Sequence, residues 1–150
     1  FGLGINKEHK NLAFFCGKVF QYQFAKAATE TELMWTPDQI AFTSGYIKGY
    51  LRQLLLHSGS SDYDLERKLL KIACNEAYPK GAWNIFLRGE AMAALAKAST
   101  QEPILQSGIA YKNGQDSGNG DANMYLMTDE EDINPPKPVG LTSFLIANQE

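Results

Sequence analysis

Two glycines stand one helical turn apart in the segment TSGYIKGYL, residues 43–51, and each is followed by a tyrosine. Gly45 and Gly49 share one face of the expected helix because residues i and i+4 stack along a helix. Each glycine costs up to about 1 kcal/mol in helix propensity relative to alanine, so a favourable contact must offset it. We predict that a neighbouring helix crosses closely here, with Tyr46 and Tyr50 beside the contact offering hydroxyls for buried hydrogen bonds. A ligand groove along this face is the alternative.

Apolar periodicity and capping residues predict four helices, at about residues 8–28, 36–57, 61–78 and 82–98, with one or two further turns near residues 104–111. The clearest start is TPDQ at residues 36–39, where the threonine can cap, the proline suits the first turn and the glutamine completes a capping box. The predicted fold class is therefore all-α, a single-domain bundle of four to five helices within residues 1–111.

Residues 112–150 are predicted to lie outside the bundle. KNGQDSGNGDAN combines glycine, asparagine and aspartate so densely that we expect a loop, and the acidic, proline-rich TDEEDINPPKP should stay extended. The apolar segment at residues 139–147 follows as part of an extended C-terminal arm. It either docks on a neighbouring molecule or folds back to complete the core of its own domain, and the sequence leaves both open.

Charge and motif patterns exclude several classes of function. Fourteen Lys and Arg residues are scattered among seventeen Asp and Glu residues, giving a net charge of -3, so we expect no nucleic-acid partner. No apolar run approaches the roughly 20 residues that span a bilayer. The two histidines and two cysteines show no metal-ligand spacing, and no nucleotide-binding or hydrolase motif occurs. We expect no metal and no cofactor.

The two cysteines, Cys16 and Cys74, fall on inward faces of the first and third expected helices. They could remain two buried thiols, or they could form a disulfide if their Cα atoms come within about 7 Å. A disulfide would indicate an oxidising compartment. An even count of two does not decide between these possibilities.

The order of motifs resembles a known group of proteins. A cysteine in a first helix is followed by GYIKGYL in a second, by a charged loop, by LLKIACNEAYP and by an alanine-rich helix. Over residues 11–98 this order resembles small helical periplasmic proteins of Gram-negative bacteria, including acid-stress chaperones and immunity proteins against type VI secreted amidases. Those families are generally shorter and do not lead us to expect residues 112–150.

The resemblance implies that Cys16 pairs with Cys74 and that Gly45, Tyr46 and Gly49 support the helix contact. It also implies a periplasmic or secreted location and a function in binding proteins. The first residue, Phe1, fits a chain from which a signal peptide has been removed.

The leading hypothesis is a non-enzymatic, exported binding protein, such as a chaperone, an immunity or inhibitor protein, or an envelope-assembly subunit. Its partner would be another protein or a second copy of the chain. The candidate partner-binding residues are apolar side chains of the first helix and of the C-terminal arm: Phe14, Phe20, Phe24, Val139, Leu141, Phe144, Leu145 and Ile146.

Two other classes remain as alternatives. A small cell-wall hydrolase would need a pair of carboxyl groups at a defined separation, for which Glu76 and Glu90 are the candidates. Solvated glutamates on helix surfaces are the simpler interpretation of both residues. The other alternative is a cytosolic structural module of a phage or mobile element.

Overall fold

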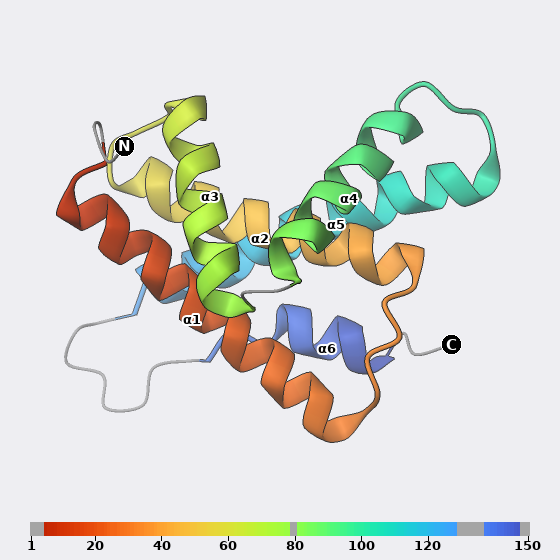
Figure 1. Cartoon of the computed structure of the whole chain (residues 1–150), viewed down its shortest axis with the longest axis horizontal. Coiled ribbons are helices and arrows are strands. Elements are labelled where there is room, and N and C mark those ends of the chain that lie inside the picture. The colour runs from red at the N-terminus through yellow and green to blue at the C-terminus, as the bar shows by residue number, and fades with distance from the viewer. Residues whose placement is uncertain (1–4, 79–80, 129–136, 148–150) are drawn as a thin grey trace.

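The computed structural model describes residues 5–78, 81–128 and 137–147 (Figure 1). The helices within these ranges are α1 (Lys7–Glu30), α2 (Pro37–His57), α3 (Tyr63–Ala77), α4 (Ala82–Ala96), α5 (Glu102–Leu126) and α6 (Gly140–Ala147), and no strand occurs in the same part of the chain. The predicted all-α, single-domain fold is confirmed. The described residues form six helices, however, where four to five were expected.

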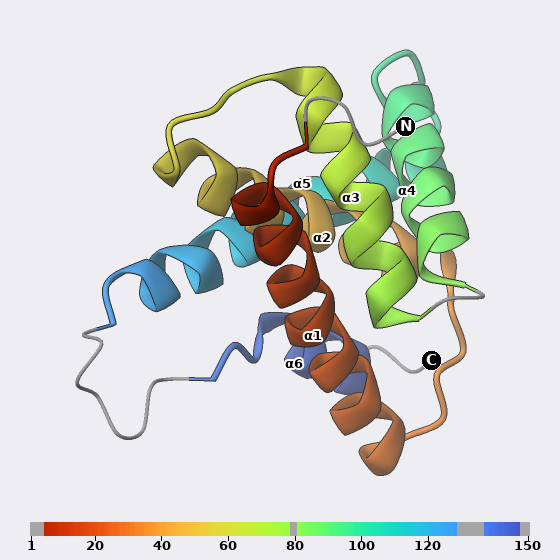
Figure 2. The same cartoon turned by 60° about the vertical axis from the view of Figure 1, so that its left-hand side comes forward.

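Helix α2 is the central element, since it contacts each of the other five helices (Figures 1 and 2). Its start is fixed by the predicted capping box: the Thr36 backbone amide donates to Gln39 Oε1 at 2.9 Å, and the Gln39 amide donates to Thr36 Oγ1 at 3.3 Å. Apolar side chains on more than one face of α2 are buried, among them Ile40, Ile47 and Leu51. A helix that is apolar on several sides belongs inside a bundle.

Gly45 and Gly49 lie directly against the backbone of α5. A Cβ atom on Gly45 would overlap the carbonyl oxygen of Tyr111, and one on Gly49 would overlap that of Gln115. No alanine fits at either position unless the backbones move apart. The helix that crosses α2 here is α5, which follows the four helices predicted from the sequence.

The close approach is reciprocal, and it corrects the predicted loop. A Cβ atom on Gly114 would overlap the carbonyl oxygen of Phe42, and one on Gly118 would overlap that of Tyr46. The segment KNGQDSGNGDAN is therefore helical within α5, and the expected domain boundary between residues 111 and 112 falls inside this helix. Contact with α2 outweighs the poor helix propensity of the glycines. The buried face of α5 consists of small residues: Ser107, Ala110, Gly114, Gly118 and Ala122.

The apolar C-terminal segment folds back onto this chain's own core as α6, so the extended arm was wrong over residues 140–147. Leu141 and Leu145 are fully buried, and the ring of Phe144 stacks on that of Phe42 with 3.8 Å between centroids. The burial of these side chains holds in place a chain end that would otherwise fray. Most of the acidic, proline-rich stretch, residues 129–136, lies outside the described residues.

None of the helices in the described part of the chain is both long and apolar enough to cross a bilayer.

Candidate functional site

A groove of about 740 Å³ lies between α4 and α5, with the side chains of Lys48 and Arg52 reaching into it from α2. We call it the α4–α5 groove. Helix α4 and the first half of α5 form a hairpin that projects from the bundle (Figure 1). The apolar part of the groove lining consists of Ala93, Ala94, Ala96, Leu105, Gly108 and Ile109.

Two glycines position the helices around this groove. A Cβ atom on Gly108 would lie 2.6 Å from the Cβ atom of Ala96, so α4 and α5 approach closely near the tip of the hairpin. Gly89 similarly lets α4 lie against Ser44 of α2, whose hydroxyl donates to the Phe86 carbonyl oxygen at 2.7 Å. The walls of the groove are thus held by close packing of glycine backbone against short side chains.

The groove gathers positive charge in a chain whose net charge is -3. Its basic lining residues are Lys48, Arg52, Lys97 and Lys112, and its acidic lining residues are Glu90 and Asp116. Lys97 and Lys112 form no ion pair with any other described residue, and both are exposed. Clustered charge of one sign raises the local concentration of oppositely charged ligands.

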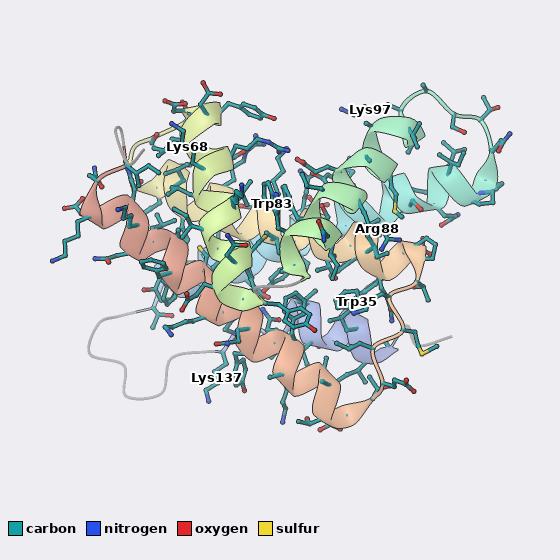
Figure 3. All side chains as sticks on the ribbon, viewed as in Figure 1. Trp35, Lys68, Trp83, Arg88, Lys97 and Lys137 are labelled. Atoms are coloured by element: carbon teal, nitrogen blue, oxygen red, sulfur yellow. The ribbon has the colours of Figure 1, made fainter. Side chains whose placement is uncertain are left out.

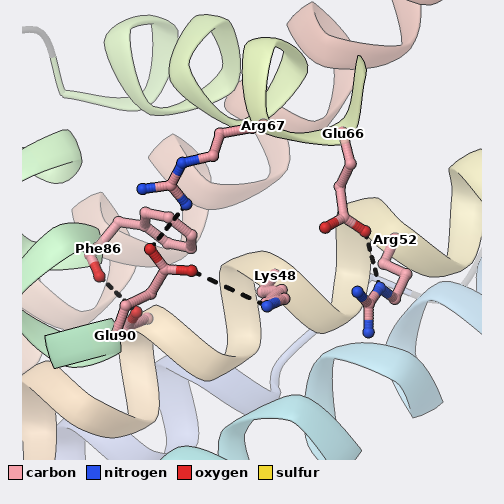
Figure 4. Close-up of polar contacts among 7 residues, drawn as sticks. Lys48, Arg52, Glu66, Arg67, Phe86 and Glu90 are labelled. Carbon is pink, nitrogen blue, oxygen red and sulfur yellow. Dashed lines mark hydrogen bonds and ion pairs between the residues drawn. The ribbon is translucent and has the colours of Figure 1, made fainter. Parts of the chain in front are cut away.

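Glu90 links three helices beside the groove (Figure 4). Arg67 Nη1 of α3 donates to Glu90 Oε1 at 2.8 Å, and Lys48 Nζ of α2 lies 3.9 Å from Glu90 Oε2. The hydrogen bond to Glu90 raises the pKa of Arg67. The Arg67 guanidinium also lies over the ring of Trp83, 5.6 Å from its centroid, which fixes the arginine further.

A second ion pair joins α2 to α3 in the same region. Arg52 Nε donates to Glu66 Oε1 at 2.7 Å, and the Glu66 side chain is only 5% exposed (Figure 4). Burial raises the pKa of the neighbouring Tyr111 hydroxyl to about 12, with the negative charge of Glu90 as the next cause. Tyr111 is therefore a neutral hydrogen-bonding group of the groove at physiological pH.

The candidate carboxylates of a hydrolase, Glu76 and Glu90, lie in different environments. Glu90 lines the α4–α5 groove with its two oxygens facing Arg67 and Lys48, whereas Glu76 pairs with Lys18 of α1 at 3.6 Å. A glycosidase needs both carboxyl groups on either side of one bond. The α4–α5 groove, which Glu90 lines, is not lined by Glu76.

Cys16 and Cys74 are free, buried thiols, so the disulfide implied by the resemblance is not present. Helix α1 lies close to α3 at Gly17, where an added Cβ atom would be 2.7 Å from the Ala73 carbonyl oxygen. Cys16 is rotated about 100° from that contact line on its helix. Burial raises the pKa of both thiols, to about 12 for Cys74, and Glu90 contributes to the latter shift.

The structure separates the expected partner-binding residues into three groups. Phe20, Leu141 and Leu145 are fully buried in the core of this chain and are unavailable to a partner in this conformation. Phe24 and Phe144 are partly buried, and each contacts another aromatic ring. The exposed residues are Phe14, Val139 and Ile146, on α1 and around α6.

The positive residues of the groove were missed at the level of sequence. They come from α2, α4 and α5, and no spacing along the chain brings the three helices together. Only Lys48 and Arg52 carried a signal, because residues four apart on one helix point the same way. Among the described residues, no group of three or more His, Cys, Asp or Glu side chains could hold a metal ion.

Comparison with protein-family models, curated proteins and solved structures found no significant match to this chain.

Proposed function

We propose that this chain is a non-catalytic helical binding protein whose α4–α5 groove receives an acidic, partly apolar segment of another protein. The observation that carries the proposal is a pair of lysines, Lys97 and Lys112, that form no ion pair with another described residue and line a groove whose apolar part is alanine, leucine, isoleucine and glycine. A carboxylate-bearing segment would neutralise these charges while its apolar side chains cover the wall.

Exposed apolar surface at the same place supports protein binding. The Ile109 side chain is 52% exposed and lines the groove, and Leu95 of α4 is 64% exposed on the same hairpin. An apolar patch rimmed by charges is typical of a protein-interaction surface. The ion pairs of Glu90 and Glu66 keep the α2 side of the groove in place, so little ordering is required on binding.

The test uses the full chain and a helical model peptide that alternates glutamate and leucine on one face. Backbone amide shifts mapped by NMR should change around Lys97, Ile109 and Lys112, and raising the salt concentration should weaken binding. The double variant Lys97→Glu/Lys112→Glu should lose at least tenfold in affinity.

The matched control is Lys68→Glu/Lys71→Glu, which makes the same charge change at exposed positions of α3 outside the groove. It should change affinity less than twofold at moderate salt. Equal losses in the two double variants would show that net charge and not the groove governs binding, and would refute the proposal.

An exported location belongs to the same proposal and is supported by the resemblance of residues 11–98 to small helical periplasmic proteins. The two free, buried thiols remove the disulfide as a support for this location. Fractionation of cells that carry the full-length gene should place the protein in the periplasm or medium, and recovery with cytosolic markers would contradict export.

A further inference from the structure

A second groove, of about 600 Å³, lies between the C-terminal half of α1, the linker that leads into α2 and the end of α3. Its lining includes three aromatic side chains, Phe24, Trp35 and Tyr78, and one carboxylate, Glu32. Figure 3 labels Trp35 beside the linker from α1 to α2. We call it the aromatic groove; it shares no lining residue with the α4–α5 groove.

Trp35 is held in a costly backbone conformation. Its φ is +52°, the only positive φ among the non-glycine residues that the structure describes. A bulky residue in the left-handed region is a rare outlier, and such outliers concentrate at ligand clamps. The capping box at Thr36 fixes the next residue, so the tryptophan ring is directed onto Phe24, with 5.8 Å between centroids at an interplanar angle of 72°.

Tyr78 forms the other aromatic side of the groove and is also braced. Its amide donates to the Cys74 carbonyl oxygen at 3.0 Å, and its carbonyl accepts from Gly81 and Ala82 at 3.1 Å each. A Cβ atom on Gly81 would lie 2.9 Å from two ring carbons of Tyr78, so the ring rests against backbone. The ring nevertheless remains 54% exposed. A fixed, exposed aromatic ring favours binding, because little side-chain freedom is lost.

The charge of the aromatic groove is opposite to that of the α4–α5 groove. Among the described residues of the lining, Glu32 is the only charged one, and it forms no ion pair within the described part of the chain. The faces of aromatic rings carry negative electrostatic potential and attract cations. An anion would meet a carboxylate and three rings, whereas a cation would find both favourable.

We infer that the aromatic groove binds a quaternary ammonium group, seated between Trp35 and Tyr78 with its charge toward Glu32. The largely apolar wall favours methylated nitrogen over a primary ammonium, which is more strongly hydrated, and one carboxylate does not offer the paired acceptors that suit a guanidinium. Recognition of quaternary ammonium by aromatic side chains follows the same physics. The inference is independent of the proposed function.

The test is an NMR titration of the full chain with choline chloride at constant ionic strength. Saturable shifts are expected at the Trp35 indole NH and around Tyr78, with a dissociation constant in the millimolar range. The neutral isostere 3,3-dimethylbutan-1-ol should bind at least threefold more weakly, because it has the same shape without the charge. Equal binding of the isostere, absence of saturable shifts, or tighter binding of arginine methyl ester would overturn the inference.

Two variants separate binding from folding, since both residues are exposed. Glu32→Gln should weaken choline binding at least threefold, and Tyr78→Leu about tenfold. The control is Tyr63→Leu, which removes an equally exposed ring of α3 outside the groove and should leave the affinity unchanged. If Tyr63→Leu weakens binding as much as Tyr78→Leu does, the aromatic groove is not the site.

Vesicle binding distinguishes the two possible sources of the quaternary ammonium group, a lipid headgroup and a free small molecule. Co-sedimentation with phosphatidylcholine vesicles, but not with phosphatidylglycerol vesicles, would assign a lipid headgroup. Binding of choline without co-sedimentation would assign a free small molecule.

Discussion

At the crossing of α2 and α5 no side chain separates the two backbones, whereas α6 is held by side chains that reach between helices. The crossing is made by glycines from both partners, each in contact with a carbonyl oxygen of the other helix. In the α6 seat, which we define as Gln23, Tyr46, Asp121 and the amides of residues 140–142, Gln23 Oε1 accepts from the Leu141 and Thr142 amides at 3.0 and 3.2 Å.

Three further bonds of the seat form a chain across four helices. Gln23 Nε2 donates to Tyr46 Oη at 2.8 Å, Tyr46 Oη donates to Asp121 Oδ2 at 2.6 Å, and the Gly140 amide donates to the same oxygen at 2.9 Å. The two regions therefore fail in different ways. The crossing cannot accept an added atom. The seat cannot lose Gln23 as an acceptor, because the Leu141 and Thr142 amides are buried.

The largest effect is expected from Gly45→Ala at the crossing. The added methyl would overlap the Tyr111 carbonyl oxygen, so the helices must separate, and the free energy of unfolding should fall by about 3 kcal/mol. Urea denaturation followed by circular dichroism measures this change. The loss should occur although alanine has the higher helix propensity.

Gly120→Ala on α5 is the matched control, because an added Cβ atom there meets nothing within 4 Å. This variant should be more stable than the parent by up to about 1 kcal/mol, from helix propensity alone. If the two variants changed stability alike, close packing could not be the reason for the glycines.

Only one of the two helices of the crossing could be predicted from the sequence. The glycines of α2 stand among apolar residues of strong helical period, so their cost was visible and a close contact could be inferred. Those of α5 stand among asparagine, aspartate and serine, where low local propensity indicated a loop. A signal existed in the recurrence of small residues at spacings of three and four from Ser107 to Ala122. Its meaning depended on a partner helix distant in sequence.

The α6 seat and the two grooves were harder to predict from the sequence, because their residues also come from segments that are distant along the chain. Gln23 stands between Tyr22 and Phe24 in the sequence, and its amide partners lie 118 and 119 residues away. The sequence left open whether the last apolar segment docks on this chain or another. The α4–α5 groove depends on lysines from separate helices, and the strained backbone of Trp35 has no counterpart in periodicity.

Within the seat, Gln23→Ala should cost about 2 to 3 kcal/mol, because it leaves the Leu141 and Thr142 amides buried without an acceptor. The loss should be local. Hydrogen exchange of the α6 amides should accelerate much more than that of α2. The control Gln53→Ala removes a half-buried bond to Asn123 of 2.7 Å and should cost less than about 1 kcal/mol. Uniform acceleration throughout the molecule would contradict a separable seat.

Alkaline pH tests the one residue that serves both regions. Burial, followed by the hydrogen bond to Asp121, raises the pKa of Tyr46 above its ordinary value of 10.0. Above about pH 10 the unfolded chain loses this proton while the folded chain keeps it, so stability present below pH 10 is lost as pH rises, by up to about 1.4 kcal/mol per unit.

Tyr46→Phe removes this dependence. The variant should be less stable than the parent at pH 7, because it lacks the bonds to Gln23 and Asp121, and the difference should shrink by about 1 kcal/mol between pH 10 and 11. Urea titrations at both pH values measure it. Parallel loss of stability in parent and variant would mean that Tyr46 ionises in the folded chain as readily as in the unfolded one.

The smallest effect should come from Phe144→Leu on the outer side of α6. The rings of Phe144 and Phe42 stack at an interplanar angle of 1°, and leucine keeps an apolar contact while losing the stack, so the cost should be about 1 kcal/mol. Ile146→Ala, at a 37% exposed position of the same helix, should cost less. A loss of stability in Phe144→Leu as large as that in Gln23→Ala would show that apolar packing holds α6 as strongly as the buried hydrogen bonds do. The crossing and the α6 seat would then both depend mainly on packing, and would differ only in how closely the backbones approach.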